Sequence, residues 1–305
     1  MSINWQLPSP LQNISNAACQ VRNIQLWLKR EDQIHPTLSG NKWRKLKYNL
    51  QAARTQNYNT LVTFGGTFSN HIAATAAAGH LCNFQTYGII RGEATASQNP
   101  TLQQAQAHGM QLHFVDRSTY RNANRIALAQ QLIPEPFYFL PEGGTNQLAL
   151  KGCAEIVLEL KEQLIQLPDF VCVSCGTGGT IAGIIQGING RQRVIGFSAL
   201  KGDFLEKEVR QLLENELDNW EIMTDYHFGG YAKIKPILIA FMQQFYAQYQ
   251  IPLEPIYTGK MLYGIFDLIE KGFFPDGSQI VAIHTGGLQG IEGINKRFGL
   301  DLPDV

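Results

Sequence analysis

The segment "VSCGTGGTIAG", residues 173–183, has the pattern of a short apolar strand that turns through glycines into a helix. The turn consists of Gly176, Thr177, Gly178, Gly179 and Thr180. Glycines let the backbone turn sharply and direct several N–H groups at one point, and the helix that follows adds the positive end of its dipole. The pattern favours a phosphate-binding cradle over a tight turn without a ligand. It is not a Walker A loop, because no Gly-Lys-Ser/Thr follows, and Ile181 occupies the third glycine position of the dinucleotide fingerprint.

The rest of the chain repeats this order of strand and helix. We expect strands at 59–66, 84–92, 110–116, 169–176, 193–200 and 278–287, and helices at 70–81, 100–109, 152–164, 180–188 and 261–272. The strands are apolar throughout, which is typical of parallel sheets with helices on both faces. The sequence therefore predicts an α/β fold. Segment 134–147, with three prolines and a Gly pair, is the best candidate for a crossing between domains.

Composition limits the classes of function. The 305 residues are enough for two domains, and 25 Lys and Arg balance 25 Asp and Glu. This balance does not indicate nucleic acid or an anionic membrane surface, and a small neutral or zwitterionic ligand fits better. The five cysteines are scattered, and the single C-x-x-C of Cys172 and Cys175, on opposite faces of a strand, is a poor zinc site, so no metal is expected. Without a signal peptide or a membrane span, we expect a cytoplasmic protein.

Ligands of open parallel sheets bind beyond the carboxyl ends of the strands. Polar, glycine-containing turns follow three predicted strands, at 65–70, 176–180 and 284–287, and we expect them to lie near one another. Ser69 and Asn70 begin an alanine-rich helix, where they can cap it or hold a carboxylate. His71 is expected to be a packed or exposed polar residue. Tyr257 can be a core aromatic or an acid–base group at the mouth of a site.

The segment "LSGNKWRKLKYNL", residues 38–50, places Lys42 directly after a Ser-Gly-Asn turn. Lys42 could be one of several solvated cations, because Lys45 and Lys47 follow it. However, a phosphate cradle without a Walker lysine suggests a phosphorylated cofactor. A lysine can hold such a cofactor as a Schiff base when burial or neighbouring cations lower its pKa, and Arg44 and Lys45 could supply that field. From spacing alone, both interpretations of Lys42 remain open.

Six segments in order, "KREDQIHPTLSGNKWRKLKY", "TFGGTFSNHIAATAA", "EGGTN", "CGTGGTIAG", "YTGKMLYGI" and "HTGG", resemble the 1-aminocyclopropane-1-carboxylate deaminase and D-cysteine desulfhydrase family of pyridoxal-phosphate enzymes. The resemblance extends from about residue 29 to residue 287. It implies the tryptophan-synthase-β-like fold (PLP fold type II). A large cofactor-binding domain would comprise residues 1–44 and 153–305, and a small inserted α/β domain residues 45–152. Pyridoxal 5′-phosphate would lie between them, and the resemblance also implies a homodimer.

The resemblance also implies roles for residues that bind the cofactor. Lys42 would carry it and act as the base at Cα of the substrate, and residues 176–180 would bind its phosphate. Asn70 would lie on the hydroxyl side of the pyridine ring. Thr258 and Thr285 would face the ring nitrogen.

For the substrate, the resemblance implies binding by Ser69, Asn70 and His71. Ser69 would lie near the substrate carboxylate or transfer a proton. Tyr231 and Tyr257 would stand over the substrate and join Lys42 and Ser69 as catalytic residues.

Two residues bear on the choice of substrate. Thr258 stands where the cyclopropane deaminases carry glutamate and the D-cysteine desulfhydrases carry threonine, and a hydroxyl supports a protonated ring nitrogen much less than a carboxylate does. Phe68 stands where glutamine is common, which would remove an amide from the substrate pocket. The cyclopropane substrate has no α-hydrogen, so its ring must be opened. D-cysteine needs only loss of a proton and a thiol, and Thr258 therefore favours β-elimination from a D-amino acid, typified by conversion of D-cysteine to pyruvate, sulfide and ammonia.

Other activities remain open at this stage. The same family resemblance allows a 1-aminocyclopropane-1-carboxylate deaminase. The same fold allows a racemase or an L-amino-acid deaminase. A protein that binds pyridoxal phosphate or another phosphometabolite without turnover is an alternative of a different class.

Overall fold

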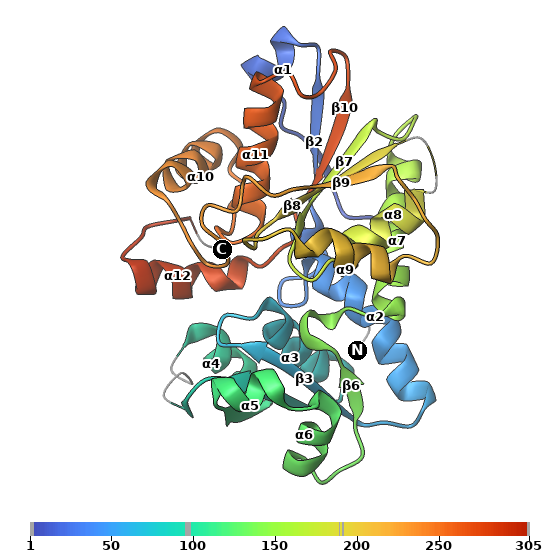
Figure 1. Cartoon of the computed structure of the whole chain (residues 1–305), viewed down its shortest axis with the longest axis vertical. Helices are drawn as coiled ribbons and strands as arrows, with labels where there is room; N and C mark the ends of the chain where they lie inside the picture. The colour runs from blue at the N-terminus through green and yellow to red at the C-terminus, as the bar shows by residue number, and fades with distance from the viewer. Residues whose placement is uncertain (1–2, 95–98, 189, 191, 304–305) are drawn as a thin grey trace.

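The computed structural model describes residues 3–94, 99–188, 190 and 192–303. Within these residues the chain forms two sheets, one in each half of the molecule, with helices packed around them (Figure 1). The strand order is β1-β2-β10-β7-β8-β9 in the larger sheet and β5-β4-β3-β6 in the smaller. The strand pairs are parallel except β1 with β2. The predicted α/β fold with mainly parallel sheets is confirmed.

The larger sheet combines segments from both ends of the chain. Its strands are β1 (Leu11–Asn13), β2 (Gln25–Lys29), β7 (Phe170–Cys175), β8 (Arg193–Ser198), β9 (Trp220–Met223) and β10 (Gln279–Ile283). The helices of this half are α1 (Ala17–Val21), α7 (Gln147–Gln163), α8 (Gly179–Ile188), α9 (Phe204–Leu212), α10 (Pro236–Tyr249), α11 (Thr258–Glu270) and α12 (Ile291–Phe298).

The smaller sheet comes from one continuous part of the chain. Its strands are β3 (Thr60–Gly66), β4 (Gln85–Arg91), β5 (Gln111–Val115) and β6 (Tyr138–Leu140). Its helices are α2 (Gly40–Thr55), α3 (Asn70–Cys82), α4 (Pro100–Ala107), α5 (Arg117–Asn122) and α6 (Arg125–Leu132). Short 3-10 helices lie at Glu31–Gln33, Glu142–Gly144 and Leu288–Gly290.

Strand β7 shows why the strands are apolar throughout. Val171 and Val173 are buried in a cluster that includes side chains of α7, α8 and α9. Cys172, between them, is buried in a second cluster with side chains of α10 and α11. Successive side chains of a strand point to opposite faces, and here helices cover both faces. Cys175 belongs to the first cluster, so Cys172 and Cys175 lie on opposite faces as predicted.

Helices α2 and α7 connect the two halves and pack closely. A side chain at Gly152 of α7 would overlap the backbone carbonyl of Arg44 in α2. The Arg44 guanidinium also donates to Glu31 at 2.8 Å and to Glu159 of α7 at 2.7 Å, and these side chains are largely buried. The domain boundaries expected at 44/45 and 152/153 fall inside these continuous helices. The division into domains at those residues stays a prediction.

Two expectations of local structure need correction. Strand β10 ends at Ile283 rather than at 287, because Gly286 and Gly287 have φ of +77° and +88° and turn the chain away. Helix α7 begins at Gln147 rather than at 152. Segment 134–147 contains β6, which pairs with β3, and its role as a crossing between domains stays a prediction. In the described part of the chain, none of the helices has the length and apolar character needed to cross a membrane.

Candidate active site

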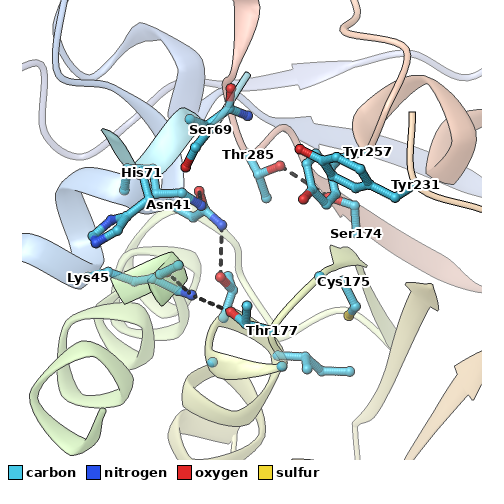
Figure 2. A pocket seen from close by; sticks show the side chains of 18 residues that line it. Asn41, Lys45, Ser69, His71, Ser174, Cys175, Thr177, Tyr231, Tyr257 and Thr285 are labelled. Atoms are coloured by element: carbon cyan, nitrogen blue, oxygen red, sulfur yellow. Dashed lines mark hydrogen bonds between the residues drawn. The ribbon is translucent and has the colours of Figure 1, made fainter. Parts of the chain in front are cut away.

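A cavity lies where the carboxyl ends of β7 and β10 meet the N-termini of α2, α3 and α8 (Figure 2). Its empty space is about 610 Å³, part of it open to solvent. It is lined by Asn41, Lys42, Lys45, Ser69, Asn70, His71, Gly143, Ser174, Cys175, Gly176, Thr177, Gly178, Gly179, Thr180, Ile181, Tyr231, Tyr257 and Thr285. All three turns that were expected to lie together contribute to this wall.

The start of α2 places Lys42 in the cavity. Gly40 has φ +67°, and a side chain there would overlap the carbonyl oxygen of Thr285, so only glycine permits this close approach. The Asn41 N–H donates to the same carbonyl at 3.3 Å. The Lys42 ammonium then lies 3.2 Å from the Asn41 side-chain oxygen.

The surroundings of Lys42 favour its neutral amine. Burial and the positive charge of Lys45 lower the pKa of Lys42 to about 7. Lys45 follows one turn later and lines the same cavity. Arg44, which the sequence suggested as a second source of this field, points instead into the ion cluster with Glu31 and Glu159. A lysine with a pKa near 7 is a good nucleophile and base at neutral pH.

The glycine turn after β7 forms the floor of the cavity. Gly178 has φ +74°, and Gly179 begins α8. A side chain on Gly179 would lie 2.7 Å from the Thr145 hydroxyl, so the cradle is closely packed. The Asn41 side-chain amide donates to the Thr180 hydroxyl at 2.8 Å, which ties α2 to this turn.

Lys45 binds the rim of the cradle, a role that the sequence did not reveal. Its ammonium donates to the Gly143 carbonyl and the Thr145 hydroxyl, both at 3.0 Å. It also donates to the Thr177 hydroxyl at 3.3 Å (Figure 2). A signal was present, because Lys45 stands three residues after Lys42 and such residues share a helix face. The "EGGTN" segment contains Gly143 and Thr145, but its sequence pattern does not indicate their contacts with Lys45.

Ser69, Asn70 and His71 enter the cavity from the N-terminus of α3. The Ser69 hydroxyl accepts from the Ile72 N–H at 3.3 Å, so it caps the helix and also lines the cavity. The Asn70 side-chain oxygen accepts from Gln289 at 2.8 Å. His71 is buried, and its ring nitrogens have no hydrogen-bond partner among the described residues. Burial and the charges of Lys42 and Lys45 lower the pKa of His71 well below its usual value, so the ring is neutral.

Two tyrosines close the opposite side of the cavity. The rings of Tyr231 and Tyr257 meet edge to face, with centroids 6.2 Å apart (Figure 2). Tyr257 lies against Gly176, because a Cβ atom added to Gly176 would be 3.2 Å from the phenol oxygen of Tyr257. Burial raises the pKa of Tyr257 well above its usual value, and desolvation also raises the pKa of Tyr231, although that residue is 42% exposed, so both hydroxyls are proton donors at neutral pH.

Lys260 holds the loop that carries Tyr231. Its ammonium is buried and donates to the backbone carbonyls of His227 and Gly230, each at 2.9 Å. Burial lowers the pKa of Lys260 to about 8.

Thr258 is not among the residues that line the cavity, and its expected position at the ring nitrogen stays a prediction. It is fully buried, and its N–H donates to the Glu254 carboxylate at 2.7 Å. Glu254 folds back onto the start of α11 and also accepts from the Tyr257 N–H at 2.6 Å, and burial raises its pKa to about 7. Ser174 and Thr285 supply the hydroxyls on the cavity wall instead, with their oxygens 3.1 Å apart.

Phe68 is also outside the cavity wall. Its ring packs against Gly293 of α12, where an added side chain would lie 3.2 Å away, and the Arg297 guanidinium lies 5.4 Å from its centroid. The expected loss of an amide from the substrate pocket at this residue stays a prediction.

These features fit pyridoxal phosphate. The glycine turn lines the cavity at the N-terminus of α8 with Lys45 at its rim, and the half-buried Lys42 amine faces the same space. The family model described as "Pyridoxal-phosphate dependent enzyme" matches residues 4–286. The chain belongs to this family. Pyridoxal phosphate is its cofactor, and the protein is a pyridoxal-phosphate dependent enzyme.

Individual relatives are similar over most of the chain. The bifunctional D-cysteine desulfhydrase/1-aminocyclopropane-1-carboxylate deaminase of Arabidopsis thaliana mitochondria is 31% identical, over 93% of this chain and 77% of the relative. A putative 1-aminocyclopropane-1-carboxylate deaminase of Pyrococcus horikoshii is 29% identical, over 94% and 91%. The crystal structure of an ACC deaminase homologue superposes with a TM-score of 0.81 at 26% identity, covering 94% of this chain and 91% of that one. These relatives support the expected enzyme family and the PLP fold type II.

Proposed function

We propose that this enzyme catalyses β-elimination from a small D-amino acid, with D-cysteine as the substrate and pyruvate, sulfide and ammonia as the products. The observation that supports the choice is the chemistry of the cavity wall. Among the described residues, those that line the cavity include no Asp or Glu. Glu254, a buried carboxylate behind the wall, is occupied by backbone N–H groups at the start of α11.

The absence of a carboxylate from the described cavity lining matters because a carboxylate would help to stabilise the electron pair left on Cα of the substrate. When bound, pyridoxal phosphate withdraws the electron pair that remains after a bond to Cα breaks. A charged partner at its ring nitrogen would stabilise this electron pair by about a few kcal/mol more than a hydroxyl does, by analogy with charge-assisted hydrogen bonds. A difference of about 1.4 kcal/mol in the barrier changes the rate tenfold. Elimination tolerates the weaker hydroxyl partners, because the departing thiolate carries the electron pair away. Ring opening of the cyclopropane substrate has no such leaving group.

The side chains of the cavity suit the proton transfers of this reaction. Neutral Lys42 can accept the α-proton of the substrate, and the Cα–H and Cβ–S bonds break while a Cα–Cβ double bond forms. Tyr257 and Tyr231, both protonated, can donate a proton to the departing sulfur. Ser69 and the N-terminus of α3 can receive the substrate carboxylate. Water then hydrolyses the released enamine to pyruvate and ammonia.

Ring opening is the second candidate, because relatives that match most of the chain are named as 1-aminocyclopropane-1-carboxylate deaminases. The two reactions differ in their products. A steady-state assay should therefore compare pyruvate release from D-cysteine with 2-oxobutanoate release from the cyclopropane substrate.

We expect turnover of D-cysteine to exceed ring opening by at least tenfold. Lys42→Ala should be inactive, whereas Lys47→Ala should be active, because Lys47 pairs with Glu155 at 2.7 Å and does not line the cavity. Faster ring opening would contradict the argument from the cavity wall. Faster turnover of L-cysteine, racemisation without elimination, or cofactor binding without products would each contradict the proposed reaction.

We further propose, from the family resemblance, that the enzyme is a homodimer with a large domain of residues 1–44 and 153–305 and a small domain of residues 45–152. We also propose, from the sequence expectation, that it is cytoplasmic. Light scattering of the purified protein tests the dimer, and cell fractionation tests the location. Native-state hydrogen exchange tests the division, because the residues of each part should exchange as a separate cooperative unit.

A further inference from the structure

A second pocket lies at the carboxyl edge of the smaller sheet. Its lining residues are Arg91, Arg117, Tyr120, Arg121, Arg125 and Glu142, around about 800 Å³ of empty space that is partly open to solvent. Arg91 is the last residue of β4. Arg117 is the second residue after the end of β5, and Glu142 is the second residue after the end of β6. These strands are parallel, so all three residues lie at one edge of the sheet. This is the edge at which open parallel sheets bind ligands.

The pocket has an excess of positive charge. It contains four guanidinium groups and one carboxylate, that of Glu142, which pairs with Arg125 at 3.4 Å. Arg91, Arg117 and Arg121 form no ion pair with a carboxylate of any residue that the structure describes. Like charges gathered in one pocket repel, and an anion that bridges them removes this repulsion.

The Asp116 carboxylate, at the start of α5, does not serve this purpose. It accepts hydrogen bonds from the N–H groups and hydroxyls of Ser118 and Thr119 within its own helix turn. The positive groups of the pocket therefore remain available to an external anion.

Tyr120 provides an independent sign of a ligand. The residue is 2% exposed and lines the pocket, and its hydroxyl makes no hydrogen bond of normal geometry to any described residue, although the Glu142 carboxylate lies near enough to help raise its pKa. A buried polar group without a partner is costly unless a ligand or water completes it. The guanidinium groups of Arg125 and Arg91 lie 3.9 Å and 5.4 Å from the centroid of its ring, so the aromatic ring holds two of the arginines.

The pocket is a neighbour of the cofactor cavity. Glu142 lines the pocket, and the next residue, Gly143, lines the cavity and accepts from Lys45. On the other side, the Arg91 guanidinium lies 3.6 Å from the position of a side chain on Gly66, three residues before Ser69. The two sites therefore share walls but use different side chains.

We propose that this arginine pocket is a second anion-binding site, for a small molecule with two or more negative charges such as a phosphate monoester or a dicarboxylate. Arginine forks match the planar carboxylate and the phosphate group with paired hydrogen bonds, and the Tyr120 hydroxyl supplies one further donor. A monoanion would leave most of the charge excess in place. The proposal does not depend on which amino acid the enzyme converts.

Calorimetric titration of the holoenzyme at constant ionic strength tests the proposal. Bound pyridoxal phosphate occupies the phosphate cradle, so added anions report other sites. Inorganic phosphate and succinate are the divalent probes, and acetate is the monovalent control. We expect phosphate or succinate to bind at least tenfold more tightly than acetate, and the responding probe distinguishes a phosphate ligand from a dicarboxylate.

The variants locate the site. The affinity for the divalent probe should fall at least tenfold in the triple variant Arg91→Gln/Arg117→Gln/Arg121→Gln. If this variant does not fold, the affinity should fall at least threefold in the single variant Arg117→Gln, whose side chain is exposed. Tyr120→Phe should also lose at least threefold. Arg193→Gln, at the start of β8 and outside the pocket, should bind as the wild type does. Equal binding by the arginine variants, equal binding of acetate, or no binding of either divalent probe would overturn the proposal.

Discussion

Replacing Gly40 with alanine should destabilise the apo-protein by about 2–4 kcal/mol. Gly40 has φ +67°, a conformation that costs an L-residue about 1 kcal/mol. The added Cβ would also overlap the Thr285 carbonyl oxygen and lie 2.6 Å from the carbonyl carbon. The backbones of α2 and of the turn after β10 must then separate, and such overpacking typically costs about 1–3 kcal/mol. The two contributions together give the expected loss.

Gly109→Ala is the matched control for this experiment. Gly109 has φ +87°, but a side chain there would meet nothing within 4 Å, so its replacement should cost only about 1 kcal/mol. Urea denaturation gives the free energies of unfolding. Gly40→Ala should also retain less cofactor after gel filtration, because Lys42 stands two residues further along the displaced chain. Equal destabilisation by the two substitutions would refute the role of the Thr285 contact.

Four further outcomes are expected. Lys42→Ala should abolish borohydride fixation of the cofactor, and a peptide map that finds it fixed to another lysine would contradict the assignment. Gly178→Val should weaken cofactor retention, because a β-branched residue resists φ +74°. If equilibrium dialysis of the folded variant gave an unchanged cofactor affinity, the phosphate would have to bind elsewhere. Lys260→Met should raise KM more than it lowers kcat, because the backbone carbonyls of His227 and Gly230 lose their donor and the loop of Tyr231 loosens. Hydrogen exchange in that loop should rise, and an unchanged KM would show that the loop does not depend on this contact. Acylation of Lys42 in the apo-enzyme should increase with pH through about 7 and then level off, because only the neutral amine reacts. Removing a like charge with Lys45→Met should move this midpoint to higher pH, and an unmoved midpoint would show that burial alone sets it.

The sequence predicted the central strands best, because their signals are local. Strands β3 and β7 are apolar runs that end at glycines, and their observed bounds differ from the predicted ones by one residue at each changed end. Strand β2 was missed. Its five residues are too short for a clear pattern, and it becomes a strand by pairing with β10, about 250 residues away. Such a strand depends on tertiary pairing that periodicity does not contain.

Motifs located the candidate site, but not the direction of every side chain. Tyr257 and Thr258 are neighbours in a motif, and both were expected at the cavity. Because Tyr257 precedes α11 with a non-helical backbone and Thr258 is the first residue of the helix, the two side chains face different surroundings. Glu254 then captures the Thr258 N–H, a contact that depends on how the preceding loop folds back. The sequence shows which residues are present, whereas loop packing decides which of them face the cavity.

Helix α2 reconciles two requirements that would otherwise conflict. The Lys42 amine must be neutral to react, and the phosphate must meet positive charge. Lys45 meets both, because its ammonium lies at the rim of the cradle and also lowers the pKa of Lys42. Arg44, between them in sequence, adds nothing to this field because Glu31 and Glu159 neutralise it. A phosphate dianion in the cradle would offset the charge of Lys45, so the pKa of Lys42 should be lowest before the cofactor binds, when its amine must act as the nucleophile.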